Sequence, residues 1–229
     1  MKFNSRLLPT GLFCAVLALF LATPASAQIP TGQVGVSIGG NFETLDDVSG
    51  GNTEASFNSA VGFHAGITYD QPVSTTAPLS NLSVRPGVFA RRVGQYGFPG
   101  SIEGSGAGLL ENEEFTLWMF EVPVDLRYQI PVETGPVSLY GLIGPQISIP
   151  RADSDFEATL NDVSYAVNLG VGGEISLPAG LTLMPELRYE LGVTNAFKDE
   201  FTYRFREFSI EDSPNFGGPQ LRVHLTYGL

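Results

Sequence analysis

Leu181-Thr-Leu-Met-Pro-Glu-Leu-Arg-Tyr-Glu-Leu-Gly-Val193 is the stretch that decides the fold class. Its odd-numbered positions are apolar or aromatic, whereas its even-numbered positions include Glu186, Arg188 and Glu190. Successive side chains of a strand point to opposite faces of a sheet. The alternation therefore predicts a strand with one lipid-like face and one charged face.

The same alternation recurs seven more times. The segments are Val34–Phe42, Val61–Tyr69, Leu82–Arg91, Trp118–Ile130, Val137–Ile149, Val163–Leu177 and Leu221–Leu229. In Val137–Ile149 the apolar face is ambiguous, because Tyr140 and Leu142 compete with Leu139 and Ile143. We expect the odd-numbered residues of that segment to point outward. Eight alternating segments predict an all-β fold.

The distribution of bulky and small residues separates the inside of this sheet from the outside. A small barrel has little room within it and a large outer circumference. Here the bulky apolar faces are opposed by faces rich in glycine and charged residues. A soluble barrel of the lipocalin type would show the reverse, with charged residues outside. The sequence therefore predicts an eight-stranded antiparallel up-and-down transmembrane β-barrel in the cell outer membrane.

The connections between the strands alternate in length. The longer ones are Glu43–Ser56, Gln95–Glu114, Pro150–Asp162 and Asn195–Phe216. The shorter ones are Gln71–Pro78, Pro131–Pro136 and Pro178–Gly180. Such alternation is typical of outer-membrane barrels, with long loops outside the cell and tight turns in the periplasm. Prolines weaken strand pairing, so we expect local bulges at the four that fall within strands. These are Pro86, Pro123, Pro145 and Pro185.

Residues 1–27 have the pattern of a secretory signal peptide. Lys2 and Arg6 precede the apolar run Leu12–Ala22, and Ala25-Ser-Ala27 provides a small-residue cleavage site. We expect residues 28–229 to form the barrel domain. The single cysteine, Cys14, lies in the segment to be removed, so disulfides and thiolate metal sites are not expected.

The charge balance is strongly acidic. The whole chain has a formal net charge of −12, and loss of Lys2 and Arg6 makes it −14. Such a chain repels phosphate backbones, so nucleic acid is not an expected partner. The four long loops hold 17 of the 24 acidic residues, and their basic residues are Arg151, Lys198, Arg204 and Arg206.

Four short motifs carry a resemblance to a known family. They are Glu121-Val-Pro-Val-Asp-Leu-Arg-Tyr128, Tyr140-Gly-Leu-Ile-Gly-Pro145, Leu169-Gly-Val-Gly-Gly-Glu174 and Glu186-Leu-Arg-Tyr-Glu-Leu-Gly-Val-Thr-Asn195. With them the chain resembles the PorT-like outer-membrane β-barrel family of Bacteroidetes-type envelopes, which is similar in architecture to OmpX and the OmpA barrel. The resemblance extends over nearly all of residues 28–229. It implies the fold, and it implies no activity because the family shares no catalytic residues.

Ten ionisable residues are predicted to face the lumen. They are Arg85, Arg91, Glu121, Asp125, Arg127, Glu174, Glu186, Arg188, Glu190 and Arg222. A selective polar path and a closed, paired core are both compatible with such a set. Five acids against five bases favour the paired core, because an eight-stranded barrel is filled by its own side chains and buried charges must be paired.

Other motifs point to no catalytic or metal site. His64 and His224 are the two histidines of the chain. His224 precedes Thr226 where a lipid A deacylase would need a serine, so we expect His224 to be a hydrogen-bonded core histidine. Asp153, Asp155 and Glu157 alternate in one loop, but their spacing fits no EF-hand. We expect no cofactor.

The leading functional hypothesis is a non-enzymatic structural or interaction barrel that acts through its acidic loops. A small porin and a membrane-embedded lipid-modifying enzyme are the alternatives. The expected partners are outer-membrane lipid and lipopolysaccharide, an envelope or extracellular protein at the loops, and the barrel assembly machinery for insertion.

Overall fold

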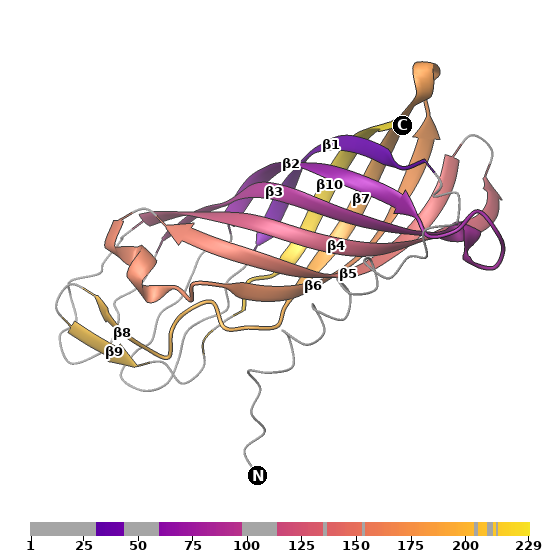
Figure 1. Ribbon diagram of the computed structural model, residues 1–229. Helices are drawn as coiled ribbons and strands as arrows, with labels where there is room; N and C mark the ends of the chain where they lie inside the picture. Colours follow the sequence, from indigo (N-terminus) through magenta and orange to yellow (C-terminus); the bar gives the residue numbers. More distant parts are fainter. Residues whose placement is uncertain are drawn as a thin grey trace, which may run out of the picture.

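A computed structural model describes residues 31–43, 60–97, 114–134, 137–152, 154–203, 206–209, 213 and 215–229. Eight long strands close into one antiparallel barrel (Figure 1). They are β1 (Gln33–Glu43), β2 (Ala60–Pro72), β3 (Leu82–Gly97), β4 (Glu114–Thr134), β5 (Val137–Ala152), β6 (Ser164–Ser176), β7 (Leu181–Gly192) and β10 (Gly218–Gly228). Each of these eight strands pairs with the next of the eight, β7 with β10, and β10 pairs with β1, so the predicted eight-stranded barrel is confirmed. No helix in the described part of the chain is long and apolar enough to cross a membrane.

The two faces of the strands differ as the alternation predicts. On β7, 57% of Leu187 is exposed on the outside of the barrel, whereas Arg188 beside it is only 2% exposed. On β5, Ile143 is exposed and Tyr140 is buried, so the odd-numbered residues of this strand point outward as expected. The outer face is therefore an apolar surface, and the inner face holds the polar side chains.

The stagger of the strands sets the width of the barrel. Cross-strand pairs lead from Arg151 on β5 once around the ring to Gly141 on the same strand, ten residues away. For eight strands this stagger corresponds to a tilt of about 40° from the barrel axis. A barrel of this size encloses only enough space for side chains to fill it.

Glycines on the inner face make room for the largest inner side chains. A methyl group on Gly172 would overlap the ring of Tyr140, and one on Gly66 would overlap the ring of Phe89. Gly39 similarly lies against the imidazole of His64. The glycine-rich alternation is thus a packing requirement, because each of these large side chains lies over a glycine of the neighbouring strand, where no side chain is in the way.

The prediction of bulges at the strand prolines is wrong. Regular register is kept at Pro86, Pro123, Pro145 and Pro185. The register shifts fall instead between Arg92 and Gly94 and between Ile130 and Thr134. Each residue of an antiparallel strand directs its N–H toward one neighbour only, so a proline removes one ladder hydrogen bond without adding a residue to the strand.

The two ends of the barrel are built differently (Figure 1). One end, here called the turn end, carries η1 (Leu79–Asn81), η3 (Pro178–Gly180) and Leu229. The opposite end, here called the loop end, carries η2 (Ser154–Thr159) and a hairpin of β8 (Glu200–Tyr203) and β9 (Arg206–Ser209).

Two connections differ from their prediction as loops. The stretch Asn195–Phe216 contains the β8–β9 hairpin, and Pro131–Thr134 continues β4. The register shift before Thr134 accounts for the second difference, because it accommodates extra residues while the strand goes on. Most of the predicted loops Glu43–Ser56 and Gln95–Glu114, and the predicted signal peptide, lie outside the described residues.

Labelling of intact cells is expected to separate the two ends. A cysteine introduced at Asn215, at the loop end, should react with an impermeant maleimide, whereas cysteines at Thr75 and Thr134 should not. Ser105, for which we also expect labelling, lies outside the described residues. Lysed cells serve as the control in which all sites must react. Labelling of Thr134 on intact cells would reverse the orientation that we assign.

Candidate functional site

The inner face of the barrel holds all ten ionisable residues that the alternation predicts for the lumen. They lie on β3 (Arg85, Arg91), β4 (Glu121, Asp125, Arg127), β6 (Glu174), β7 (Glu186, Arg188, Glu190) and β10 (Arg222). Nine of them are buried, and only Glu174 is partly exposed. The strand period of two explains this placement, because residues two apart on a strand share one face.

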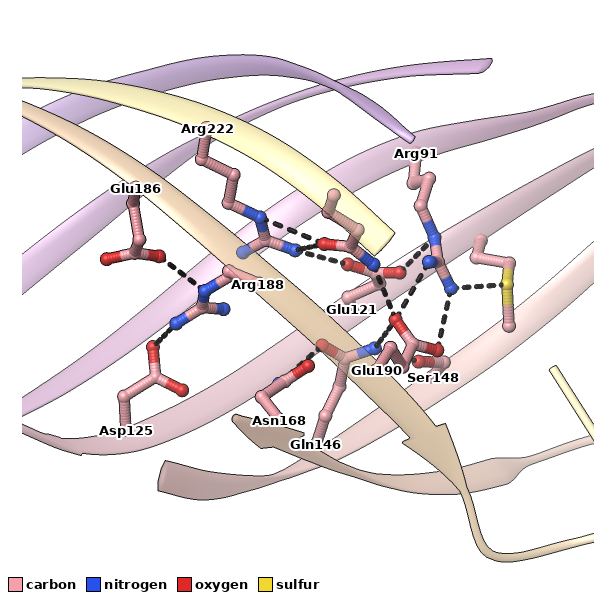
Figure 2. A network of polar contacts seen from close by, with 12 residues as sticks. Arg91, Glu121, Asp125, Gln146, Ser148, Asn168, Glu186, Arg188, Glu190 and Arg222 are labelled. Atoms are coloured by element: carbon pink, nitrogen blue, oxygen red, sulfur yellow. Dashed lines mark hydrogen bonds and ion pairs between the residues drawn. The ribbon is translucent and has the colours of Figure 1, made fainter. Parts of the chain in front are cut away.

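The first cluster lies in the half of the lumen nearer the loop end, because Glu190 is two residues before the end of β7 on that side. Figure 2 shows its side chains. The two terminal nitrogens of the Arg91 guanidinium both donate to Glu190, with Nη1–Oε2 at 2.8 Å and Nη2–Oε1 at 3.0 Å. The Nε of Arg91 also forms an ion pair with Glu121. A planar guanidinium that binds one carboxylate with two parallel hydrogen bonds is held in a single orientation.

Amides extend this first cluster toward other strands. Gln220 Nε2 donates to Glu190 Oε2 at 2.7 Å, and Gln146 Nε2 donates to the same oxygen at 3.2 Å. Arg222 donates through Nη2 to Gln220 Oε1 at 2.7 Å and lies 3.4 Å from Glu121 Oε2. Glu190 is therefore held by side chains from three other strands, β3, β5 and β10.

The second cluster lies at the middle of the lumen. Arg188 forms ion pairs with Asp125 and with Glu186, and Arg85 forms a further ion pair with Glu186. Arg85 Nη2 is also 3.7 Å from Asp125 Oδ2. The hydroxyl of Tyr140 donates to Glu186 Oε2 at 2.9 Å. Two arginines and two carboxylates thus form a closed set with a phenol as an additional donor.

The third cluster lies toward the turn end. Arg127 forms ion pairs with Asp70 on β2 and Glu174 on β6, and its guanidinium carbon is 4.1 Å from the centroid of the Tyr140 ring. Asp70 was absent from the predicted set because the alternating segment was ended at Tyr69. Its even number places it on the same face as His64 and Thr68, so extending the pattern by one residue would have identified it.

The pairs connect walls that face each other across the lumen. In the ring of eight strands, β3 is four steps from β7, and β4 is four steps from β10. Arg85–Glu186 and Arg91–Glu190 join the first two walls, and Arg222–Glu121 joins the other two. The charged side chains therefore reach across the interior, as Figure 2 shows for Arg91 with Glu190 and for Arg222 with Glu121.

Arginines and carboxylates nearly balance in this network. The described inner face carries five arginines, each in an ion pair, and six carboxylates once Asp70 is included. Buried charges are tolerated when they are paired and hydrogen-bonded. The chemistry that the arrangement supports is mutual neutralisation of its own members.

The histidines and the alternating loop acids have separate surroundings. His224 Nε2 is 3.6 Å from Glu186 Oε1, and the ring of His64 meets the ring of Phe89 edge-on. Both histidines are buried, but the 3.6 Å separation is longer than a hydrogen bond, so the expected bonded state is not observed for His224. Glu157 faces Arg151 at 3.5 Å. Asp153 lies outside the described residues, among which no cluster of metal-binding side chains is found.

Two segments at the loop end pack against each other and form what we call the loop platform, residues 154–163 and 193–203. Leu160 and Phe197 are buried between them. Asn161 Nδ2 donates to the carbonyl oxygens of Asn195 at 2.9 Å and Phe197 at 2.8 Å, and Lys198 N donates to Thr159 O at 2.9 Å. The platform therefore has a small core and backbone pairing of its own.

Comparison with known proteins identifies one family and several similar solved structures. The sequence profile of the outer membrane protein beta-barrel domain matches residues 13–216. A major outer membrane protein from Thermus thermophilus is 15% identical, with a TM-score of 0.49 over 86% of this chain and 99% of that one. Neisserial surface protein A (NspA) is 16% identical, with a TM-score of 0.45 over 86% and 97%. OprG from Pseudomonas aeruginosa is 12% identical, with a TM-score of 0.45 over 88% and 95%. No curated protein matches the chain in sequence.

Proposed function

Because the chain belongs to the outer membrane protein beta-barrel domain family, we propose that it is a non-enzymatic, non-conducting barrel that holds acidic binding loops at the cell surface. It lies in the cell outer membrane. Within the family we place it with the PorT-like and OmpX-like barrels, on the four short motifs and the eight strands.

The filled lumen is the observation that carries this proposal. Arg91, Arg188 and Arg222 are at most 2% exposed, although their side chains extend into the middle of the barrel. An open aqueous path would leave some of these groups in contact with water along its length. Ion pairs that join opposite walls also resist widening of the interior, because each opening step would separate two charges in a medium of low polarity. The geometry thus favours a plug over a pore.

The charge of the loop end supports the second part of the proposal. On the loop platform Glu157, Asp162, Asp199 and Glu200 are exposed, and Lys198 donates through Nζ to Ala158 O at 3.0 Å. An ordered acidic surface attracts basic surfaces and accelerates their encounter. We therefore propose that the partner presents clustered lysine or arginine residues.

Electrical recording is the test of the closed lumen. A chain of residues 28–229, refolded into a planar bilayer, is expected to show no stable conductance steps at about 1 M potassium chloride, where surface charges are screened, while a porin in the same bilayer does. Insertion is verified independently by the heat-dependent shift of the folded barrel in gel electrophoresis. Stable, reproducible steps from the native chain would favour the small channel instead.

The same preparation tests the loops. Binding of a lysine-rich peptide should be strong at low salt and should weaken when all four exposed acids of the platform are neutralised, in the variant Glu157→Gln, Asp162→Asn, Asp199→Asn, Glu200→Gln. The matched control is Lys198→Gln, which leaves the acids in place. Equal binding by the native chain and the neutralised variant would contradict a role for this surface.

A further inference from the structure

Two arginines stand apart from the network in the lumen because they lie on the outer face. Among the described residues, Arg92 on β3 and Arg151 on β5 are the only basic side chains on the outside of the barrel strands. Direct cross-strand pairs join them in one line: Phe63 pairs with Arg92, Arg92 with Trp118, and Trp118 with Arg151. We call these four residues, on the neighbouring strands β2 to β5, the rim row.

The rim row begins at the border between the apolar band and the loop end, with Arg151 and Trp118. Because cross-strand rows tilt with the strands, Arg92 and Phe63 lie step by step further into the band. Trp118 and Tyr128 are outward residues of β4, ten positions apart. At about 3.3 Å per residue and a tilt of about 40°, this corresponds to roughly 25 Å along the barrel axis. Outer-membrane barrels have an apolar band of about this height between two aromatic girdles. Trp118 thus marks the edge of the band at the loop end, where lipid headgroups begin.

Arg92 has no acidic partner in the described part of the chain. Its cross-strand neighbours Phe63 and Trp118 are aromatic, and their ring centroids are only 6.0 Å apart in an edge-to-face arrangement. The two rings therefore lean toward each other over the strand that carries Arg92, which is half-buried. A guanidinium in such a place is costly at the lipid face unless an anion reaches it or its long stem carries it to the headgroups.

A β-bulge fixes the backbone immediately after Arg92. The register of β3 and β4 shifts between Arg92 and Gly94. On the other side, Gly62 of β2 allows the close approach, since a methyl group there would overlap the carbonyl of Arg92. Bulges re-aim side chains and are frequent beside functional sites. The direction of Arg92 is therefore built into the sheet.

Arg151 offers the second positive charge. It is about half exposed, and its only described carboxylate contact is the 3.5 Å separation from the equally exposed Glu157. A single exposed pair of this kind contributes little, so it leaves Arg151 available to a stronger anion. Arg92 and Arg151 are two strands apart, which corresponds to roughly 10 Å between their backbones. Two arginine side chains can close on one phosphate group across that distance.

We propose that the rim row is a binding site for a phosphate group of an outer-leaflet lipid, the lipid A part of lipopolysaccharide. Arginine matches phosphate because its planar fork donates two parallel hydrogen bonds. Phe63 and Trp118 would contact the first part of an acyl chain. The proposal relies on the outward orientation of the loop end that we assign. The acidic loops otherwise repel phosphate, so the two arginines give the lipid one defined place to bind.

The single tryptophan of the chain makes the site directly observable. In detergent micelles, titration with phosphorylated lipid A should change the emission of Trp118 and give a dissociation constant. Arg92→Gln should raise the dissociation constant about tenfold, because a charge-assisted hydrogen bond is lost. Adding Arg151→Gln should raise the dissociation constant further for the same reason. Arg92→Lys should retain part of the affinity. The matched control Lys198→Gln, which removes a positive charge from the loop platform, should leave it unchanged.

Three comparisons decide the outcome. Dephosphorylated lipid A should bind at least about tenfold more weakly, and phosphatidylglycerol and inorganic phosphate more weakly than phosphorylated lipid A. Equal affinity of the native chain and the double variant would overturn the proposal, as would equal affinity for dephosphorylated lipid A. Binding of phosphatidylglycerol as tight as lipid A would overturn the assignment to lipid A. The heat-dependent gel shift confirms that each variant is folded. A conducting lumen would refute the proposed function and leave these affinities untouched.

Discussion

Replacement of Arg188 by methionine is expected to lower the free energy of unfolding by about 3–5 kcal/mol. Arg188 is buried at the middle of the lumen, where it forms ion pairs with Asp125 and Glu186. Methionine has a similar volume and no charge, so the substitution removes the pairs without leaving a large cavity. Asp125 then keeps only the more distant Arg85, 3.7 Å away, and its charge is left largely uncompensated.

Urea unfolding in lipid vesicles, followed by the emission of Trp118, measures this loss. The same substitution at an exposed ion pair, Arg151→Met, is the control and should cost about 0–1 kcal/mol. Adding Asp125→Asn to Arg188→Met should restore part of the stability, because the orphaned carboxylate is removed. Glu186→Gln should restore less, since Glu186 retains Arg85 and the Tyr140 hydroxyl. A neutral Arg188→Met together with new conductance would show that the lumen is hydrated.

Replacement of Leu187 by arginine is expected to destabilise the barrel in a bilayer by about 2–4 kcal/mol. Leu187 lies on the outer face of β7, and the cross-strand pairs place it near the middle of the apolar band. A guanidinium there must leave water for hydrocarbon, or the bilayer must thin around it. Unfolding in vesicles with acyl chains of one length provides the measurement.

An outward-facing residue at a different depth in the membrane provides the matched control for Leu187. Val193 also lies on the outside, just past the end of β7 toward the loop end, and it is equally exposed. Val193→Arg should cost only about 0–1 kcal/mol, because the charge reaches the headgroups. Equal costs at Leu187 and Val193 would contradict the assignment of the apolar band to the membrane.

The period of two was sufficient to predict the ring of strands and the face of most side chains. Leu187, Arg188 and Tyr189 show why: neighbours on a strand face either lipid or lumen, and only one assignment keeps charge out of hydrocarbon. Even the ambiguous strand β5 follows this rule, because Tyr140 fits inside only over Gly172.

The partners within the lumen were predictable only in part. Proximity of Arg85 and Arg91 to Glu121 and Asp125 follows from the adjacency of β3 and β4. The pairs of Arg85 with Glu186 and of Arg91 with Glu190 depend on the stagger of the whole ring, which no local pattern contains.

Register irregularities were beyond the sequence pattern. The bulge after Arg92 has no proline to mark it, and Pro86 marks none. Register depends on how neighbouring strands fit together, which overrides local preference. The β8–β9 hairpin was missed for a different reason: Phe201 and Tyr203 do alternate with polar residues, but the whole stretch was predicted as one loop.

The ion pairs that cross the lumen also bear on the order in which the chain assembles. Arg85 and Glu186 are 101 residues apart along the chain, as are Glu121 and Arg222. Contacts between such distant segments form slowly, and until they form each charged group needs water around it. Hairpins therefore cannot insert into the membrane one at a time, because the charged inner face of an incomplete sheet would contact hydrocarbon. We expect the ring to close first in a hydrated setting and to enter the hydrocarbon as one unit.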